Sequence, residues 1–100
     1  MKVYLDDIRS TPDGWVRTYS VDETIQLLKS GKVEELSLDN DLGGGVREGW
    51  EVMAWLEGEV VVNGLTPPHR FTFHTDNTVR RDYMKAAARN ILNHVRNLPK

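Results

Sequence analysis

The chain contains no cysteine, which excludes structural disulfides, thiolate zinc sites and a cysteine nucleophile. No stretch approaches the roughly 18 apolar residues of a membrane-spanning helix, and the N-terminus, which reads MKVYLDD, has no apolar run of signal-peptide length. A large charge imbalance is also absent, because 13 basic and 15 acidic residues leave a net charge of −2. Bulk attraction to nucleic acid or to an anionic membrane is therefore not expected. The default expectation is a soluble cytoplasmic protein with no membrane partner.

What is present suits one small α/β domain. The 100 residues, of which 39% are hydrophobic, can bury a single core, so residues 1–100 are expected to form one domain. Short runs rich in β-forming residues predict strands over 3–5, 15–19, 33–42 and 70–75. Helical spacing of apolar residues predicts helices starting near residues 20, 47 and 77.

Helix ends are signalled by caps. Ser20 and Glu23 fit a capping box at the start of the first helix, and Gly31 sits where a left-handed C-terminal residue is expected. The β-branched run 60–62 fits either a strand or a continuation of the second helix to Gly64. We favour the helix because Val60 and Val61 continue its apolar stripe.

Polar side chains follow three of the predicted strands. Asp6 and Asp7 follow the first, Asp39 and Asp41 follow the third, and His74 with Thr75 ends the fourth. In a mainly parallel sheet these strand ends share one edge, where α/β proteins bind ligands. The sequence therefore predicts one site built from all three clusters. Each cluster also has a simpler explanation, as a turn or as a strand-end residue.

Crowded carboxylates without neighbouring cations suit a hard divalent ion, so Asp6, Asp7 and Asp39 predict a site for Mg²⁺ or Mn²⁺. The metal would clamp a phosphoryl oxygen. Amides of the glycine run 43–45, including Gly43 and Gly44, and of the following helix N-terminus would bind the same anion.

Two further side chains complete the predicted phosphate chemistry. His74 is expected to act as general acid or base, with assistance from Asp41. Arg9 is expected either to bind phosphate or to pair with Asp7.

Three motifs carry a family resemblance. They are the segments LDDIR (5–9), SLDNDLG (37–43) and HTDN (74–77), supported by Pro12, Trp15 and Gly49. Together they resemble the cyclic-phosphate processing receiver domains, a divergent group within the receiver fold of response regulators. The chain departs from that family pattern at Asn40, where a histidine usually stands.

The resemblance implies a shortened flavodoxin-like fold with three layers. About four mainly parallel strands would carry helices on both faces, without the fifth strand of ordinary receivers and the lysine on it. It also implies that Thr75 and Asn77 contact substrate, although Asn77 is equally well placed to cap the last helix.

The implied function is a metal-dependent phosphoesterase acting on cyclic phosphates, or on phosphate-bearing nucleotide or RNA ends. The family has been linked to RNA repair and to phage genes. Two alternatives remain: a non-catalytic pseudo-receiver that binds a nucleotide or a partner protein, and a receiver phosphorylated on Asp39. The missing lysine disfavours the last.

Two surface features concern partners. Without a fifth strand the sheet keeps an open edge, through which a homodimer can form. Arg81, Lys85 and Arg89 recur at four-residue spacing on the last helix. A solvated face is the simpler explanation of this stripe, and contact with nucleic acid is the alternative.

Overall fold

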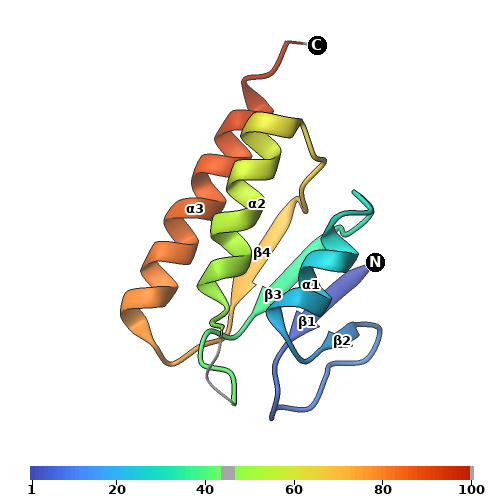
Figure 1. Ribbon diagram of the computed structural model, residues 1–100, viewed down its shortest axis with the longest axis vertical. Helices are drawn as coiled ribbons and strands as arrows, with labels where there is room; N and C mark the ends of the chain where they lie inside the picture. The colour runs from blue at the N-terminus through green and yellow to red at the C-terminus, as the bar shows by residue number, and fades with distance from the viewer. Residues whose placement is uncertain (44–46, 100) are drawn as a thin grey trace.

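The structure is a computed structural model that describes residues 1–43 and 47–99 (Figure 1). Its elements follow the order β1 (Lys2–Leu5), β2 (Val16–Thr18), α1 (Val21–Leu28), β3 (Glu35–Leu38), α2 (Trp50–Asn63), β4 (Arg70–Phe73) and α3 (Thr78–Arg96). The four strands form one sheet in the order β2-β1-β3-β4, and every neighbouring pair is parallel. The predicted α/β fold with a parallel, receiver-like sheet is confirmed.

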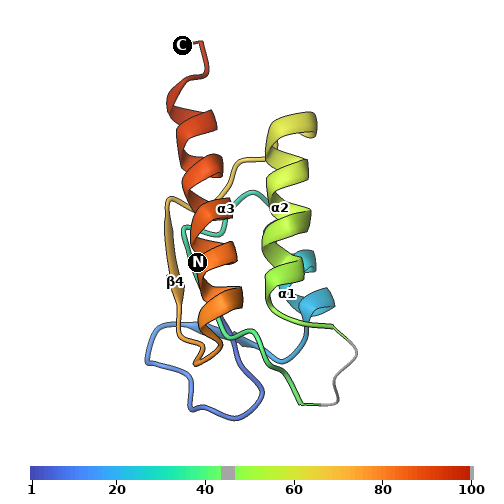
Figure 2. The same ribbon diagram turned by 90° about the vertical axis from the view of Figure 1, so that its left-hand side faces the viewer.

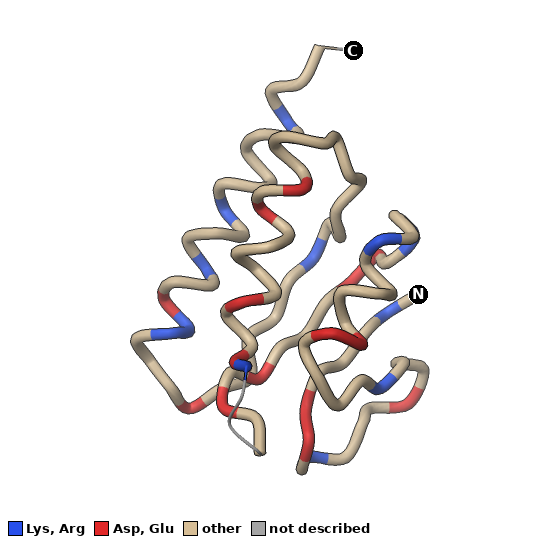
Figure 3. Tube along the Cα trace, in the orientation of Figure 1, with Lys and Arg blue, Asp and Glu red and all other residues tan. Residues whose placement is uncertain are grey.

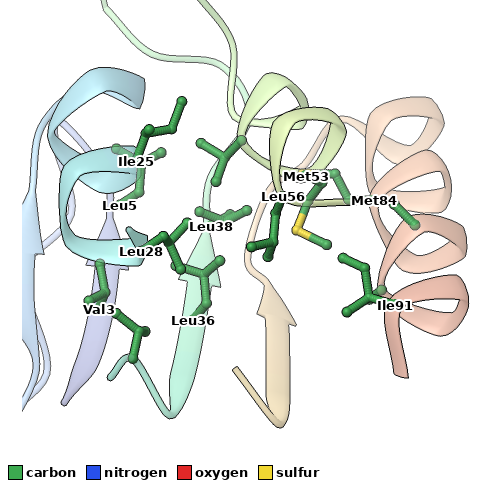
Figure 4. Close-up of a cluster of buried hydrophobic side chains, with 14 of the residues drawn as sticks. Val3, Leu5, Ile25, Leu28, Leu36, Leu38, Met53, Leu56, Met84 and Ile91 are labelled. Atoms are coloured by element: carbon green, nitrogen blue, oxygen red, sulfur yellow. The ribbon is translucent and has the colours of Figure 1, made fainter. Parts of the chain in front are cut away.

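One face of the sheet carries the core. Val3 and Leu5 of β1 alternate with residues of the other face, as do Leu36 and Leu38 of β3, and all four are fully buried. They point toward residues from all three helices, such as Leu28 of α1, Met53 and Leu56 of α2 and Ile91 of α3 (Figure 4). The sheet and its three helices thus share a single hydrophobic core.

The expectation of helices on both faces was wrong, because in the described part of the chain all three helices lie on one side of the sheet (Figure 2). The steps from β2 to β3 and from β3 to β4 run in the same direction across the sheet. Right-handed crossovers in one direction place their helices on the same face. The step from β1 to β2 runs the other way, and its connection, 6–15, holds no helix. The fold therefore has two layers.

Several helix boundaries follow the predicted signals, but α2 starts at Trp50 rather than near residue 47, and the C-cap of α1 is Lys29, with Gly31 two residues beyond it at a φ of 70°. Ser20 caps α1 by accepting a hydrogen bond from the Glu23 amide. Residues 60–62 belong to α2, which ends at Gly64 with a φ of 72°, as expected for a left-handed terminal glycine. Asn77 caps α3 by accepting from the Arg80 amide. No helix in the described ranges is both long enough and apolar enough to span a bilayer.

Candidate metal and phosphate site

The first and third strands bring three aspartates together. β1 and β3 are neighbours with Leu5 opposite Leu38, and the Asp39 amide donates to the Leu5 carbonyl at 3.0 Å. The residues that follow both strands therefore begin at the same level of the sheet, where acidic positions gather (Figure 3). One carboxylate oxygen from each of Asp6, Asp7 and Asp39 lies within 4.8 Å of the other two. The predicted carboxylate cluster is present.

Asp6 is the buried member of this cluster. Its Oδ1 accepts hydrogen bonds from the amides of Ile8 and Arg9, at 2.8 and 3.0 Å, and its Oδ2 lies 3.1 Å from Nε2 of His74. Burial alone would raise the pKa of Asp6, but the amides of Arg9 and Ile8 and the His74 ring outweigh it, and the pKa is lowered. The site therefore favours the ionised carboxylate.

Asp7 is held from one side only. Its Oδ2 accepts a hydrogen bond from the amide of Gly43. Its Oδ1 is buried and has no hydrogen-bond partner within the described residues. A Cβ at position 43 would overlap the Asp7 carboxylate and displace that side chain, so glycine permits this close approach. Gly43 thus positions Asp7 and leaves one of its oxygens free for a ligand.

His74 lies on the face of the sheet opposite the helices. Its ring stacks on Tyr4 with centroids 4.4 Å apart, and its Nδ1 lies 2.7 Å from the Ser37 hydroxyl. Both ring nitrogens are engaged, because Nε2 faces Asp6. Burial lowers the pKa of His74, against the opposing effect of Asp6 and Asp39. His74 is therefore a largely neutral ring held in one orientation.

Arg9 links the segment that follows β1 to the segment that follows β4. Its guanidinium donates to the His74 carbonyl and lies 3.9 Å from Asp6 and 3.5 Å from Asp76. The expectation that Arg9 pairs with Asp7 was wrong, because its ion-pair partners among the described residues are Asp6 and Asp76. Its phosphate contact stays a prediction.

Asn40, the departure from the family pattern, is fully buried. Its Nδ2 donates to Asp41 and Glu48, and its Oδ1 accepts from the Trp50 amide at 3.0 Å. Its carbonyl accepts from the Gly49 amide at 2.9 Å. Asn40 therefore anchors the start of α2 to the end of β3.

This anchoring changes one expectation about anion binding. The amides of Gly49 and Trp50, at the start of α2, already have acceptors on Asn40, and the Glu48 amide donates to Glu51. The prediction that this helix N-terminus supplies amides to a phosphate was therefore wrong for these three groups. The Gly43 amide donates to Asp7, so its contact with phosphate stays a prediction, and Gly44 and Gly45 lie outside the described residues.

The remaining predicted residues form a second polar group. Asp41 is exposed and accepts hydrogen bonds from Asn40 and, at 3.5 Å, from Asn77. The Thr75 hydroxyl is buried and accepts from the Asn77 amide. Asn77 is thus both the cap of α3 and a neighbour of Asp41. Direct substrate contacts by Asp41, Thr75 and Asn77 stay predictions.

The cluster fits a hard divalent cation. Asp7 and Asp39 form no ion pair with any described residue, and the buried Oδ1 of Asp7 has no partner. A divalent cation that prefers oxygen ligands, such as Mg²⁺ or Mn²⁺, would compensate the charges of Asp7 and Asp39 and would bind the Oδ1 of Asp7. The structure can therefore hold a metal ion at Asp6, Asp7 and Asp39.

Three residues of the site were missed as participants in the sequence analysis. Tyr4 and Ser37 fix the His74 ring, and Asn40 anchors α2. Strand alternation could have found the first two, because Tyr4 and Ser37 both point away from the core face. Nothing local in the sequence pairs either residue with position 74.

Comparison with known proteins agrees with the resemblance seen in the sequence. The family model described as the cyclic-phosphate processing receiver domain matches residues 1–90. Searches of curated proteins and of solved structures gave no significant match.

Proposed function

Because the chain belongs to the family of cyclic-phosphate processing receiver domains, we propose that it is a metal-dependent phosphoesterase that opens a cyclic phosphate on a nucleotide or an RNA end. The observation that carries the proposal is the cluster of Asp6, Asp7 and Asp39, with oxygens within 4.8 Å of one another. Such a cluster matches what a phosphoryl-transfer site requires for a divalent ion.

In the proposed reaction, water attacks phosphorus and one ring P–O bond breaks, which leaves a phosphate monoester and a free hydroxyl group. A bound divalent cation supplies Lewis-acid stabilisation of the phosphoryl oxygens. The chain's own part is to hold that ion through its three aspartates and to keep Asp7 oriented through the Gly43 amide.

We assign to His74 the transfer of a proton from the attacking water to the leaving oxygen. Its neutral ring can accept a proton, and Asp6 would stabilise the imidazolium that results. Because the ionised Asp6 can only accept, the neutral ring carries its proton on Nε2, and Nδ1 is the atom that can take another. This transfer therefore requires the bond between Nδ1 and Ser37 to open.

The test uses 2′,3′-cyclic nucleotides with Mg²⁺ or Mn²⁺, and measures the monoester product. Asp39→Asn is expected to abolish turnover while circular dichroism shows an unchanged fold. Asp13→Asn is the matched control, because it makes the same change on an exposed carboxylate outside the cluster. Unchanged turnover in Asp39→Asn, or no product from the wild type with either metal, would refute the proposal.

The engagement of both His74 nitrogens favours a second candidate, a non-catalytic module that binds a nucleotide through the same metal. Calorimetry separates the two candidates. Heat of binding with Mg²⁺ and a cyclic nucleotide, without any product in the recovered sample, is the result expected of the binding module.

A further inference from the structure

A groove lies at the open edge of the sheet, and its lining shares no residue with the aspartate cluster. β4 is the last strand in the sheet order, and α3 packs beside it (Figure 2). Between them lies a groove of about 560 Å³. Apolar side chains from both elements line it, namely Phe71, Phe73, Ala88 and Leu92. In the part of the chain that the structure describes, the groove thus combines an unpaired strand edge with an apolar lining.

Three cations line the same groove. Arg81, Lys85 and Arg89 project from α3, along which basic residues recur (Figure 3). None of the three forms an ion pair with any residue in the described part of the chain, where the ion pairs involve other basic residues. Among the described residues, Arg81 alone of the three has a hydrogen-bond partner, since it donates to the Thr75 carbonyl at 3.3 Å. The groove therefore carries uncompensated positive charge.

We propose that this groove binds an extended acidic segment of a partner protein, which adds to β4 as a fifth strand. Residues four apart on a helix rise by about 6 Å, which sets the axial spacing of the three cations. Alternate side chains on a strand are about 6.7 Å apart. Carboxylates at every second position of an added strand would therefore follow the basic row closely, while its backbone pairs with the free edge of β4.

Charge and geometry argue against the other occupants. A second copy of the chain, docked edge to edge, would bring two rows of three cations together, and like charges repel. The phosphates of a nucleic acid would neutralise the cations, but a nucleic acid has no peptide backbone that could extend the sheet at β4. The acidic strand uses the edge, the apolar lining and the charges together.

The probe is a fluorescent peptide of about ten residues that alternates glutamate with valine, and the readout is fluorescence anisotropy. A second probe has the same sequence with alternate backbone amides N-methylated on the edge that would face β4. It keeps every charge but cannot donate hydrogen bonds to the strand. A lysine–valine peptide and a single-stranded RNA of about ten nucleotides complete the set.

The test variant is the double charge reversal Lys85→Glu with Arg89→Glu, both at exposed positions. The control is Lys29→Glu with Lys32→Glu, which makes the same charge change at exposed positions near the end of α1. We expect the test variant and N-methylation each to weaken peptide binding at least about tenfold, and the control to change it less than about threefold. Thermal unfolding of both variants confirms that they fold.

Each contrary result overturns the proposal. If no acidic peptide binds, or if the test variant binds as the wild type does, the groove is not its site. If N-methylation has no effect, the contact is electrostatic and no strand is added. If RNA binds more tightly than the peptide and the test variant loses it, the occupant is a nucleic acid.

Discussion

Replacing Gly49 by alanine tests whether the site depends on close backbone packing between β3 and α2. The φ of Gly49 is −56°, so an alanine backbone could adopt it without strain. Space is the obstacle. A Cβ there would lie 2.9 Å from the carbonyl carbon of Asp39 and 3.0 Å from the Cα of Asn40, and would overlap the Asp39 carbonyl oxygen outright.

Because these neighbours are main-chain atoms, one of the two segments must shift by more than an ångström. The shift would break the hydrogen bonds from the amides of Gly49 and Trp50 to Asn40, at 2.9 and 3.0 Å. Two hydrogen bonds at about 1 kcal/mol each and overpacking strain of about 1–3 kcal/mol together give about 3–5 kcal/mol. For a chain of this size each kcal/mol lowers Tm by roughly 4–8 °C, so a loss of at least about 12 °C is expected.

The assay is thermal and urea unfolding followed by circular dichroism. Gly58→Ala is the matched control, because Gly58 lies within α2 and a Cβ there would meet nothing within 4 Å. That variant is expected to gain up to about 1 kcal/mol from better helix propensity. If Gly49→Ala unfolds within a few degrees of the wild type, the close packing of α2 on the end of β3 is not as described.

Three further predictions follow from the site. Asn40→Ala removes a buried amide and leaves the helix amide it caps without an acceptor, so urea unfolding should show a loss of about 2–4 kcal/mol; a loss below about 1 kcal/mol would contradict the anchoring role. Gly43→Ala should displace Asp7 and weaken Mn²⁺ binding about tenfold, as loss of support for a ligand typically does; calorimetry giving an unchanged Kd would argue against Asp7 as a ligand. The third prediction concerns pH, measured in EDTA. The pKa values of His74 and Asp6 are lowered in the folded protein, so the unfolded chain binds protons more readily. The free energy of unfolding should therefore fall as pH drops below 6.5, because of His74, and again below 3.8, because of Asp6. His74→Gln should flatten the first step, and an unchanged step would assign it to another group.

Much of the fold was predictable because its signals are local. Alternation and β-branched runs located the strands, Ser20 and Asn77 marked two helix starts, and Gly64 marked a helix end. The strand-helix order indicated a parallel sheet, and a parallel sheet places the residues that follow its strands at one edge. For that reason the order of residues along the chain was enough to group Asp6, Asp7 and Asp39.

Other features arise from contacts between distant segments, so no local pattern reveals them. The single helical layer follows from the direction of each crossover, which requires the strand order. The His74 ring is fixed by Tyr4 and Ser37, which are far from it in sequence.

Residues 39–45, the aspartates and glycines that follow β3, show most clearly what the sequence determined and what the tertiary structure decided. Their sequence determined that carboxylates and glycines follow β3, because residue type and strand alternation are written in the chain itself. Only the tertiary structure decided their tasks: Gly43 approaches Asp7, and Asn40 turns inward to anchor α2. The reason is physical, because a buried amide or a missing Cβ acquires its role from the atoms packed against it.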